Sequence, residues 1–187
     1  ETITDIDGNV YHTVKIGTQV WLMENLKVTK YRNGDAIPNV SDNIAWANLT
    51  TGARCDIDDL PANSVIYGKL YNWYAATDSR KIAPAGWHVP SDAEWATLIA
   101  FLGGETVAGG KLRETGTEHW LPTNSTATNS SGFTGLGTGY CNLDGDFTSL
   151  NYNTYFWTTT ELNTTSAIDY GFYYQTAESF RYDDTKT

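Results

Sequence analysis

Residues 86–95, GWHVPSDAEW, carry a complete helix-start signal. Ser91 can cap a helix, and Glu94, three residues later, can bond back to it, which is the capping-box pattern. The helix is expected to run over residues 92–102 and to end at Gly103. Within it, apolar side chains recur at one-face spacing. These are Trp95, Leu98, Ile99 and Leu102. A helix of this kind occurs in many soluble domains, so it indicates no function by itself.

Strand-type sequence lies toward both ends of the chain. Strands are expected at residues 2–5, 10–16, 19–23, 155–160, 167–175 and 178–182. The first two form a hairpin around an Asp-Gly turn. A first helix is expected at 69–76 and the second at 92–102, while 32–66 and 103–139 read mostly as irregular loops. This order predicts a single α+β domain over residues 1–187, with two helices, short antiparallel sheets and long loops.

The charge balance excludes some classes of partner. The formal net charge is -10, and there is no Lys or Arg between Arg113 and Arg181. A nucleic acid or an anionic membrane would require clustered basic residues, so neither is expected. No apolar run approaches the roughly 20 residues that span a bilayer, and we expect no transmembrane segment.

Six blocks of the chain, in order, closely resemble the Fibrobacter succinogenes major paralogous domain family. They are IGTQVWLMENL (16–26), YGKLYNWYAA (67–76), GWHVPSDAEW (86–95), AGGKL (108–112), NSSGF (129–133) and YFWTTTE (155–161). The resemblance runs from about residue 4 to residue 161. It implies a C-type-lectin-like fold related to formylglycine-generating enzyme, and a location outside the cell or on the outer surface of a bacterium. It implies no established biochemical activity.

Cys55 and Cys141 are the two cysteines, and they permit one internal disulfide. Members of the family commonly end with a strand resembling Gly-Phe-Ser-Val-Arg-Cys, and no such segment precedes Thr187. If that strand is missing, Cys55 has lost its usual partner, and an unpaired sheet edge is open to another chain. A Cys55–Cys141 disulfide and self-assembly by strand exchange are therefore both open.

The sequence contains no clear catalytic motif. The histidines His12, His88 and His119 lack the spacing of zinc ligands, and His88 is expected to bond to the backbone near the helix start. No serine-nucleophile elbow or phosphate-binding loop occurs. The lone late cysteine, Cys141, lacks the paired arrangement that formylglycine-generating relatives use. We therefore expect no enzyme, and an activity of that ancestry is the least favoured alternative.

Calcium is a possible ligand because lectin-like domains often bind it. The preferred candidate is the segment NLDGD, residues 142–146, in which Asp144 and Asp146 would supply carboxylates. The competing interpretation is a turn whose side chains bond to its own backbone. No cofactor is expected to be required.

The strongest surface signal is aromatic. Residues 147–182 hold most of the late tyrosines, phenylalanines and Trp157, and tyrosine suits both sugar stacking and protein recognition. The candidate ligand-binding residues are Tyr155, Trp157, Tyr173, Tyr174 and Arg181. Core packing competes, because Phe156 and Trp157 are strand neighbours and must face opposite sides. The sequence thus predicts a non-enzymatic extracellular binding module for a glycan or a protein, with a strand-exchanging assembly subunit as the alternative.

Overall fold

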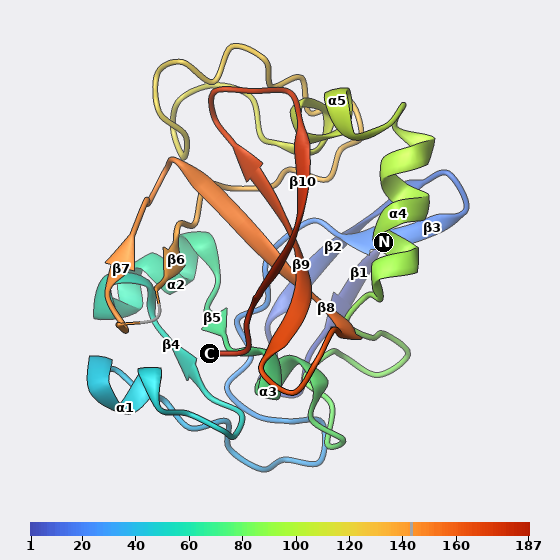
Figure 1. Ribbon diagram of the computed structural model, residues 1–187. Coiled ribbons are helices and arrows are strands. Elements are labelled where there is room, and N and C mark those ends of the chain that lie inside the picture. The colour runs from blue at the N-terminus through green and yellow to red at the C-terminus, as the bar shows by residue number, and fades with distance from the viewer. Residues whose placement is uncertain (143) are drawn as a thin grey trace.

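The computed structural model describes residues 1–142 and 144–187. The helices are α1 (Asn43–Ala47), α2 (Pro61–Tyr67), α3 (Trp73–Thr77), α4 (Asp92–Phe101) and α5 (Glu105–Leu112), with a 3-10 turn η1 at Ile57–Asp59. The strands are β1 (Thr2–Thr4), β2 (Val10–Ile16), β3 (Gln19–Leu22), β4 (Arg54–Cys55), β5 (Leu70–Tyr71), β6 (Tyr140–Cys141), β7 (Phe147–Thr148), β8 (Asn153–Glu161), β9 (Ser166–Tyr173) and β10 (Ser179–Thr185). Figure 1 shows how these elements are arranged.

Short antiparallel sheets form near both ends of the chain. Strands β1, β2 and β3 form one sheet, and β10, β9 and β8, in that spatial order, form another. Two smaller ladders pair β4 with β5 and β6 with β7. The mixed helix and sheet content and the antiparallel pairing agree with the predicted α+β class.

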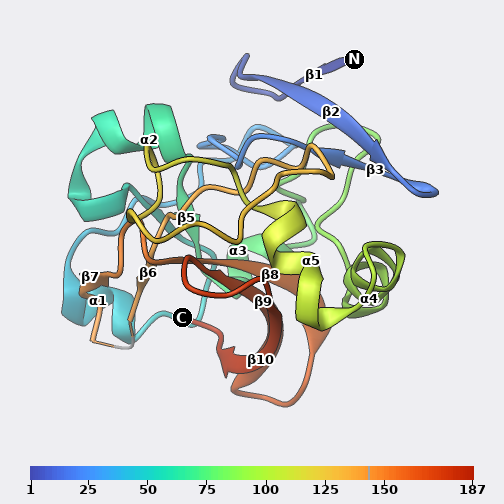
Figure 2. The same cartoon turned by 90° about the horizontal axis from the view of Figure 1, so that it is seen from above.

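Helix α4 lies between the two larger sheets, as the view from above shows (Figure 2). The predicted apolar stripe, Trp95, Leu98 and Ile99 of the helix and Leu102 at its C-cap, is buried. Around them pack Ile16 of β2, residues of α5, and the β9 side chains Ile168, Tyr170 and Phe172. This core joins the N-terminal and C-terminal sheets into one packed unit, and it is the reason why the helix-start motif is so informative.

The predicted capping box is confirmed. The Ser91 hydroxyl accepts a hydrogen bond from the Glu94 backbone, and the Glu94 carboxylate accepts one from the Ser91 backbone at 2.8 Å. The expectation for His88 was wrong: its Nε2 lies 2.8 Å from the Glu94 carboxylate, and the His88 side chain is exposed whereas that of Glu94 is partly buried. A charged acceptor already placed by the capping box competes successfully with a backbone carbonyl.

The prediction of two helices was wrong, because the described residues form five α-helices. Helix α5 was missed because it contains Gly109 and Gly110, which weaken helix propensity. The structure explains both glycines. A Cβ at Gly109 would lie 2.0 Å from the carbonyl oxygen of Glu178, and one at Gly110 would lie 2.5 Å from that of Thr126. The missing side chains let neighbouring backbone approach the helix.

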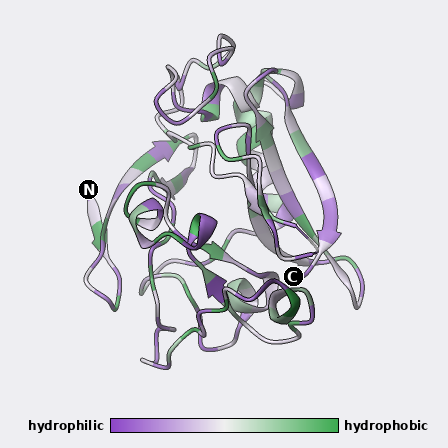
Figure 3. Ribbon diagram, turned by 90° about the vertical axis from the view of Figure 1, so that its left-hand side faces the viewer, coloured by the Kyte–Doolittle hydropathy of each residue, from purple (hydrophilic) through white to green (hydrophobic). Residues whose placement is uncertain are grey.

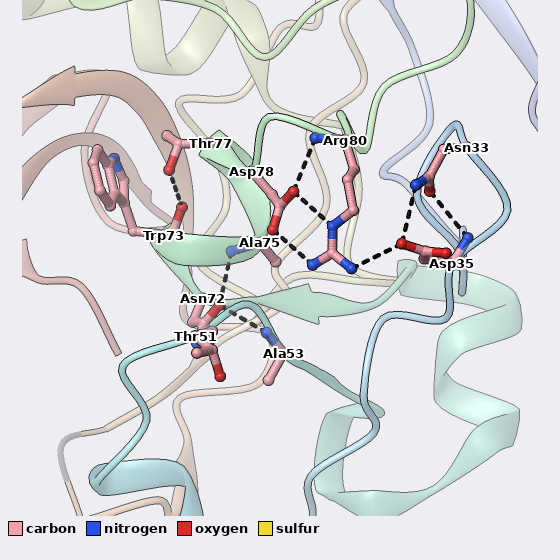
Figure 4. Close-up of polar contacts among 10 residues, drawn as sticks. All are labelled: Asn33, Asp35, Thr51, Ala53, Asn72, Trp73, Ala75, Thr77, Asp78 and Arg80. Atoms are coloured by element: carbon pink, nitrogen blue, oxygen red, sulfur yellow. Dashed lines mark hydrogen bonds and ion pairs between the residues drawn. The ribbon is translucent and has the colours of Figure 1, made fainter.

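The segment predicted as a helix at 69–76 instead holds strand β5 followed by α3, and Asn72 separates them. Asn72 is fully buried, and its Oδ1 accepts hydrogen bonds from the backbone of Ala53 and Ala75, both at 3.0 Å. Its Nδ2 donates to the Thr51 carbonyl at 2.9 Å (Figure 4). Asn72 thus caps α3 and ties it to the irregular segment before it. That segment, within 32–66, also contains α1, β4, η1 and α2.

Candidate functional site

Strand alternation sorts the late aromatic residues onto two faces of the β8–β9–β10 sheet. On the inner face, Phe156, Tyr170 and Phe172 pack in the core against α4. On the other face lies a group that we call the outer aromatic face. It consists of Tyr140, Tyr155, Trp157, Tyr173, Phe180 and Tyr182. Because neighbours on a strand point to opposite sides, the same sheet supplies both the core and most of this half-buried layer, to which β6 adds Tyr140.

Five of these side chains form one continuous set of ring contacts. Tyr155 lies at its centre, with ring centroids 5.2 Å from Tyr140, 6.1 Å from Tyr173 and 5.9 Å from Tyr182. The Tyr155 and Tyr173 hydroxyls are 2.5 Å apart, and the Tyr182 hydroxyl donates to that of Tyr173 at 3.1 Å. Burial raises the pKa of both Tyr155 and Tyr182. Their hydroxyls therefore stay protonated, and both take part in the hydrogen bonds to the Tyr173 hydroxyl.

Gly171 makes room for this cluster at the middle of β9. A Cβ there would lie 2.8 Å from the ring of Tyr155 and 3.1 Å from that of Tyr182. The two rings therefore lie over bare backbone. Any larger residue at Gly171 would push them apart.

A cleft of about 1060 Å³ opens beside the outer aromatic face. Tyr140, Tyr155, Trp157 and Tyr182 contribute to its wall, and it continues past the edge of β8 toward β3 and the segment before α4. The Trp157 ring is held in place by a hydrogen bond from its Nε1 to the Tyr71 carbonyl at 3.1 Å. The aromatic rings that line the cleft are thus held in fixed orientations by contacts within the folded protein.

Asp169 is a cleft residue that the sequence analysis missed. It is only 2 % exposed, and its Oδ1 has no hydrogen-bond partner among residues 1–142 and 144–187. Burial raises the pKa of Asp169 to about 8, and the nearby carboxylates of Asp184 and Asp183 contribute to the increase. The available signal was one acidic residue in the otherwise uncharged strand SAIDYGFY, residues 166–173. The hydropathy view shows how hydrophilic the end of the adjacent β10 is (Figure 3).

The structure brings together three of the five candidate ligand residues, Tyr155, Trp157 and Tyr173, on the outer aromatic face. Tyr174 lies elsewhere: its ring packs edge-on against Tyr152 and contacts the main core. Arg181 also lies apart from the outer aromatic face. It lies on the inner side of β10 and forms two hydrogen bonds with Asp92 at the start of α4, at 2.8 and 2.9 Å.

The segment proposed for calcium is organised by an asparagine. The Asn142 side-chain oxygen accepts hydrogen bonds from the backbone of Asp144 and Asp146, each at 2.9 Å. Both aspartates are exposed. In the part of the chain that the structure describes, no three His, Cys, Asp or Glu side chains gather as a metal site. The turn explains the sequence without a metal, and calcium binding stays a prediction.

Cys55 and Cys141 lie together in a small core cluster with Trp46 and Ala53, as free thiols. The neighbouring Cys141 thiol, together with burial, raises the pKa of Cys55, whereas the nearby Cys55 lowers the pKa of Cys141. Their contact is what the disulfide prediction requires, and the bond itself stays a prediction.

The elements and the cleft define a mixed α+β domain with several short antiparallel sheets. The family model for the Fibrobacter succinogenes major domain matches residues 14–182, and the chain belongs to this family. No curated protein and no solved structure matches the chain. None of the helices in the described residues has the length and apolar character needed to cross a bilayer.

Proposed function

We propose that this protein is a non-enzymatic binding module, located outside a bacterial cell or on its outer surface, that recognises a glycan or a protein. The observation that carries the proposal is the outer aromatic face beside the 1060 Å³ cleft. Flat rings bearing hydroxyl groups stack on sugars and pack against protein side chains equally well. Three residues chosen from sequence for this role share that face, although they come from two different strands.

A C-type-lectin-like fold is part of the proposal. It is supported by antiparallel sheets near both ends of the chain, by α4 packed between them, and by the irregular course of residues 113–139. Calcium is an optional ligand in the proposal, with Asp144 and Asp146 as its carboxylates. Calorimetric titration with Ca²⁺ tests that part, and a double Asp144→Asn, Asp146→Asn variant should lose the heat of binding.

The test of the main proposal is a screen of the purified protein on a glycan array and on a panel of immobilised extracellular proteins. Tyr140→Ala and Tyr155→Ala should weaken any specific hit by about tenfold or more, because stacked aromatic contacts dominate such sites. The matched control is Tyr152→Ala. Tyr152 is a 48 % exposed tyrosine that does not line the cleft. Equal loss in all three variants, or no loss in the first two, contradicts the assignment of the site.

A second candidate function, assembly by strand exchange, is favoured by a separate observation. Strands β3 and β8 are each the last strand of their sheet, and both border the same cleft through Val20, Leu22 and Trp157. An added strand could pair with either edge. Light scattering across a range of protein concentrations tests this candidate. A mass that stays monomeric at high concentration contradicts self-assembly, and the binding module then remains as the proposed function.

A further inference from the structure

The Asp169 carboxylate has an unusual environment for a buried acid. It lies on the central strand β9, and cross-strand pairing places Trp157 on one side of it and Tyr182 on the other. Its Oδ1 has no hydrogen-bond partner, and Asp169 forms no ion pair with any described residue. A buried carboxylate without a partner is costly, so its retention in a cleft wall calls for an explanation.

The surrounding charges make this carboxylate a site for a cation. Asp184 and Asp183, on the adjacent strand β10, are the charged groups that act on it, and both are acidic. The pKa of Asp184 is itself raised by burial and by Asp183. A positive group placed here would be attracted by several carboxylates, and no Lys or Arg of the described chain pairs with Asp169 already. The local field therefore selects for positive charge.

The residues that line the cleft favour one class of cation over another. Trp157 and Tyr182 are the direct strand partners of Asp169, and aromatic faces attract ammonium and guanidinium groups. A divalent metal ion would need several oxygen ligands, and the described residues hold no group of three acidic, His or Cys side chains. The chemistry of the wall therefore suits an organic cation.

Combining these observations, we infer that the cleft binds a Lys or Arg side chain of a polypeptide ligand. The Asp169 carboxyl group releases its proton to solvent as the cation binds and becomes its counter-ion, and Trp157 and Tyr182 form the aromatic walls. This inference rests on the proposed binding function and names the chemical group that the site recognises.

The edge of β8 favours a polypeptide as the carrier of this cation. At one end of the strand, the Asn153 carbonyl accepts from Gly139 at 2.8 Å, and at the other the Thr159 N–H donates to Pro90 at 2.9 Å. Between these two contacts, no backbone hydrogen bond joins Trp157 to a described segment outside its sheet. The Thr158 carbonyl accepts a hydrogen bond from Trp73 Nε1 at 2.9 Å, so an extended segment can pair with the part of the edge that precedes Thr158. Its basic side chain would cross Trp157 to reach Asp169, about 10 Å or two strand spacings away.

The first test uses small cations that mimic the two side chains. Backbone amide shifts of the protein are followed by NMR during titration with n-butylammonium, n-butylguanidinium and the uncharged n-butylurea. We expect saturable shifts at Trp157, Asp169 and Tyr182 with both cations, and at least about tenfold weaker effects with the urea. Equal responses to the urea and the cations overturn the inference.

Variants then identify the anion. Asp169→Asn should remove the cation response, and Asp184→Asn should weaken it severalfold, which gives a second readout if the first variant is poorly folded. The matched control is Glu178→Gln, which removes one exposed negative charge outside the cleft. An unchanged response in Asp169→Asn and Asp184→Asn overturns the inference.

The last arm distinguishes the source of the cation and separates this inference from the proposed function. Capped extended peptides that differ only in a central Arg or citrulline are compared with oligomers of glucosamine. Tighter binding of the Arg peptide than of n-butylguanidinium supports a polypeptide, whereas Asp169-dependent binding that is tightest for glucosamine oligomers overturns it. If a neutral glycan binds and depends on Tyr140 and Tyr155 while the cations do not bind, the proposed function stands and this inference fails.

Discussion

Trp157 and Asp169 are direct partners across the β8–β9 pair, and both contribute to the wall of the cleft. The next pairing, Asp169 with Tyr182, extends the same row to β10. A buried carboxylate thus lies in a row with two aromatic side chains, on the face of the sheet that does not pack against α4. This row places two of the aromatic residues of the segment 147–182 beside Asp169, an acidic residue whose properties depend on its burial.

The stability of the free protein should fall with rising pH because of Asp169. Its pKa is raised from 3.8 to about 8 in the folded state, so folding favours the protonated form. The associated stabilisation is fully present below the unfolded value of 3.8, declines as the pH rises above it and is lost as the pH passes through about 8. Urea unfolding at pH 5, 7 and 9 should show this loss in the parent protein.

The comparison variant is Asp169→Asn, which cannot ionise. Other carboxylates have pKa values shifted in the opposite direction, Asp92 through its contact with Arg181 for example, so the difference between variant and parent is the quantity to follow. The variant should gain relative stability from pH 5 to pH 9. A constant difference across that range would show that Asp169 does not titrate as described.

Replacing Asn72 by alanine should destabilise the protein by about 2–4 kcal/mol, because a buried amide that makes three hydrogen bonds is removed and α3 loses its cap. Asn33→Ala is the control, since Asn33 is exposed and bonds within its own loop to Asp35. Chemical denaturation measures both. A loss below about 0.5 kcal/mol for Asn72→Ala, typical of surface changes, would contradict the role of this amide.

Mild oxidation should join Cys55 to Cys141, because the two cysteines pack in the same small core cluster. The closed loop is long, and the resulting stabilisation is expected to be as much as about 4 kcal/mol. Thiol titration and denaturation before and after oxidation measure it, with Cys141→Ser as the control that cannot cross-link internally. Persistence of two free thiols in the oxidised protein, or cross-links only between chains, would count against the pairing.

Arg181→Gln should leave ligand binding unchanged and lower stability by about 1 kcal/mol or less. Its ion pair with Asp92 connects β10 to the start of α4, but the Arg181 side chain is 45 % exposed, so solvent screening limits its contribution. The same ligand titration used for Tyr155→Ala, together with thermal unfolding, tests both statements. Loss of binding without loss of stability would contradict this prediction and show that Arg181 contributes to the ligand site.

Much of the scaffold was predictable because its signals are local. The capping box at Ser91 and Glu94 and the apolar stripe that follows it depend on residues within three turns of one another. The opening hairpin was predictable for the same reason, since the turn around Gly8 requires a positive φ of 87°. Helix α5 could not be predicted in this way, because its glycines serve contacts with residues far away in the chain.

The features of the candidate site can likewise be separated into those that local sequence predicts and those that depend on tertiary packing. The residue pattern alone determined the family resemblance, the central helix and the aromatic density of residues 147–182, because propensity, capping and composition are properties of short segments. Three features arise only from the packing of distant segments: which aromatic residues share the outer face, the bond between Arg181 and Asp92, and the burial of the Asp169 Oδ1 with no hydrogen-bond partner among the described residues. Those outcomes depend on strand register and desolvation, which arise when distant segments pack together.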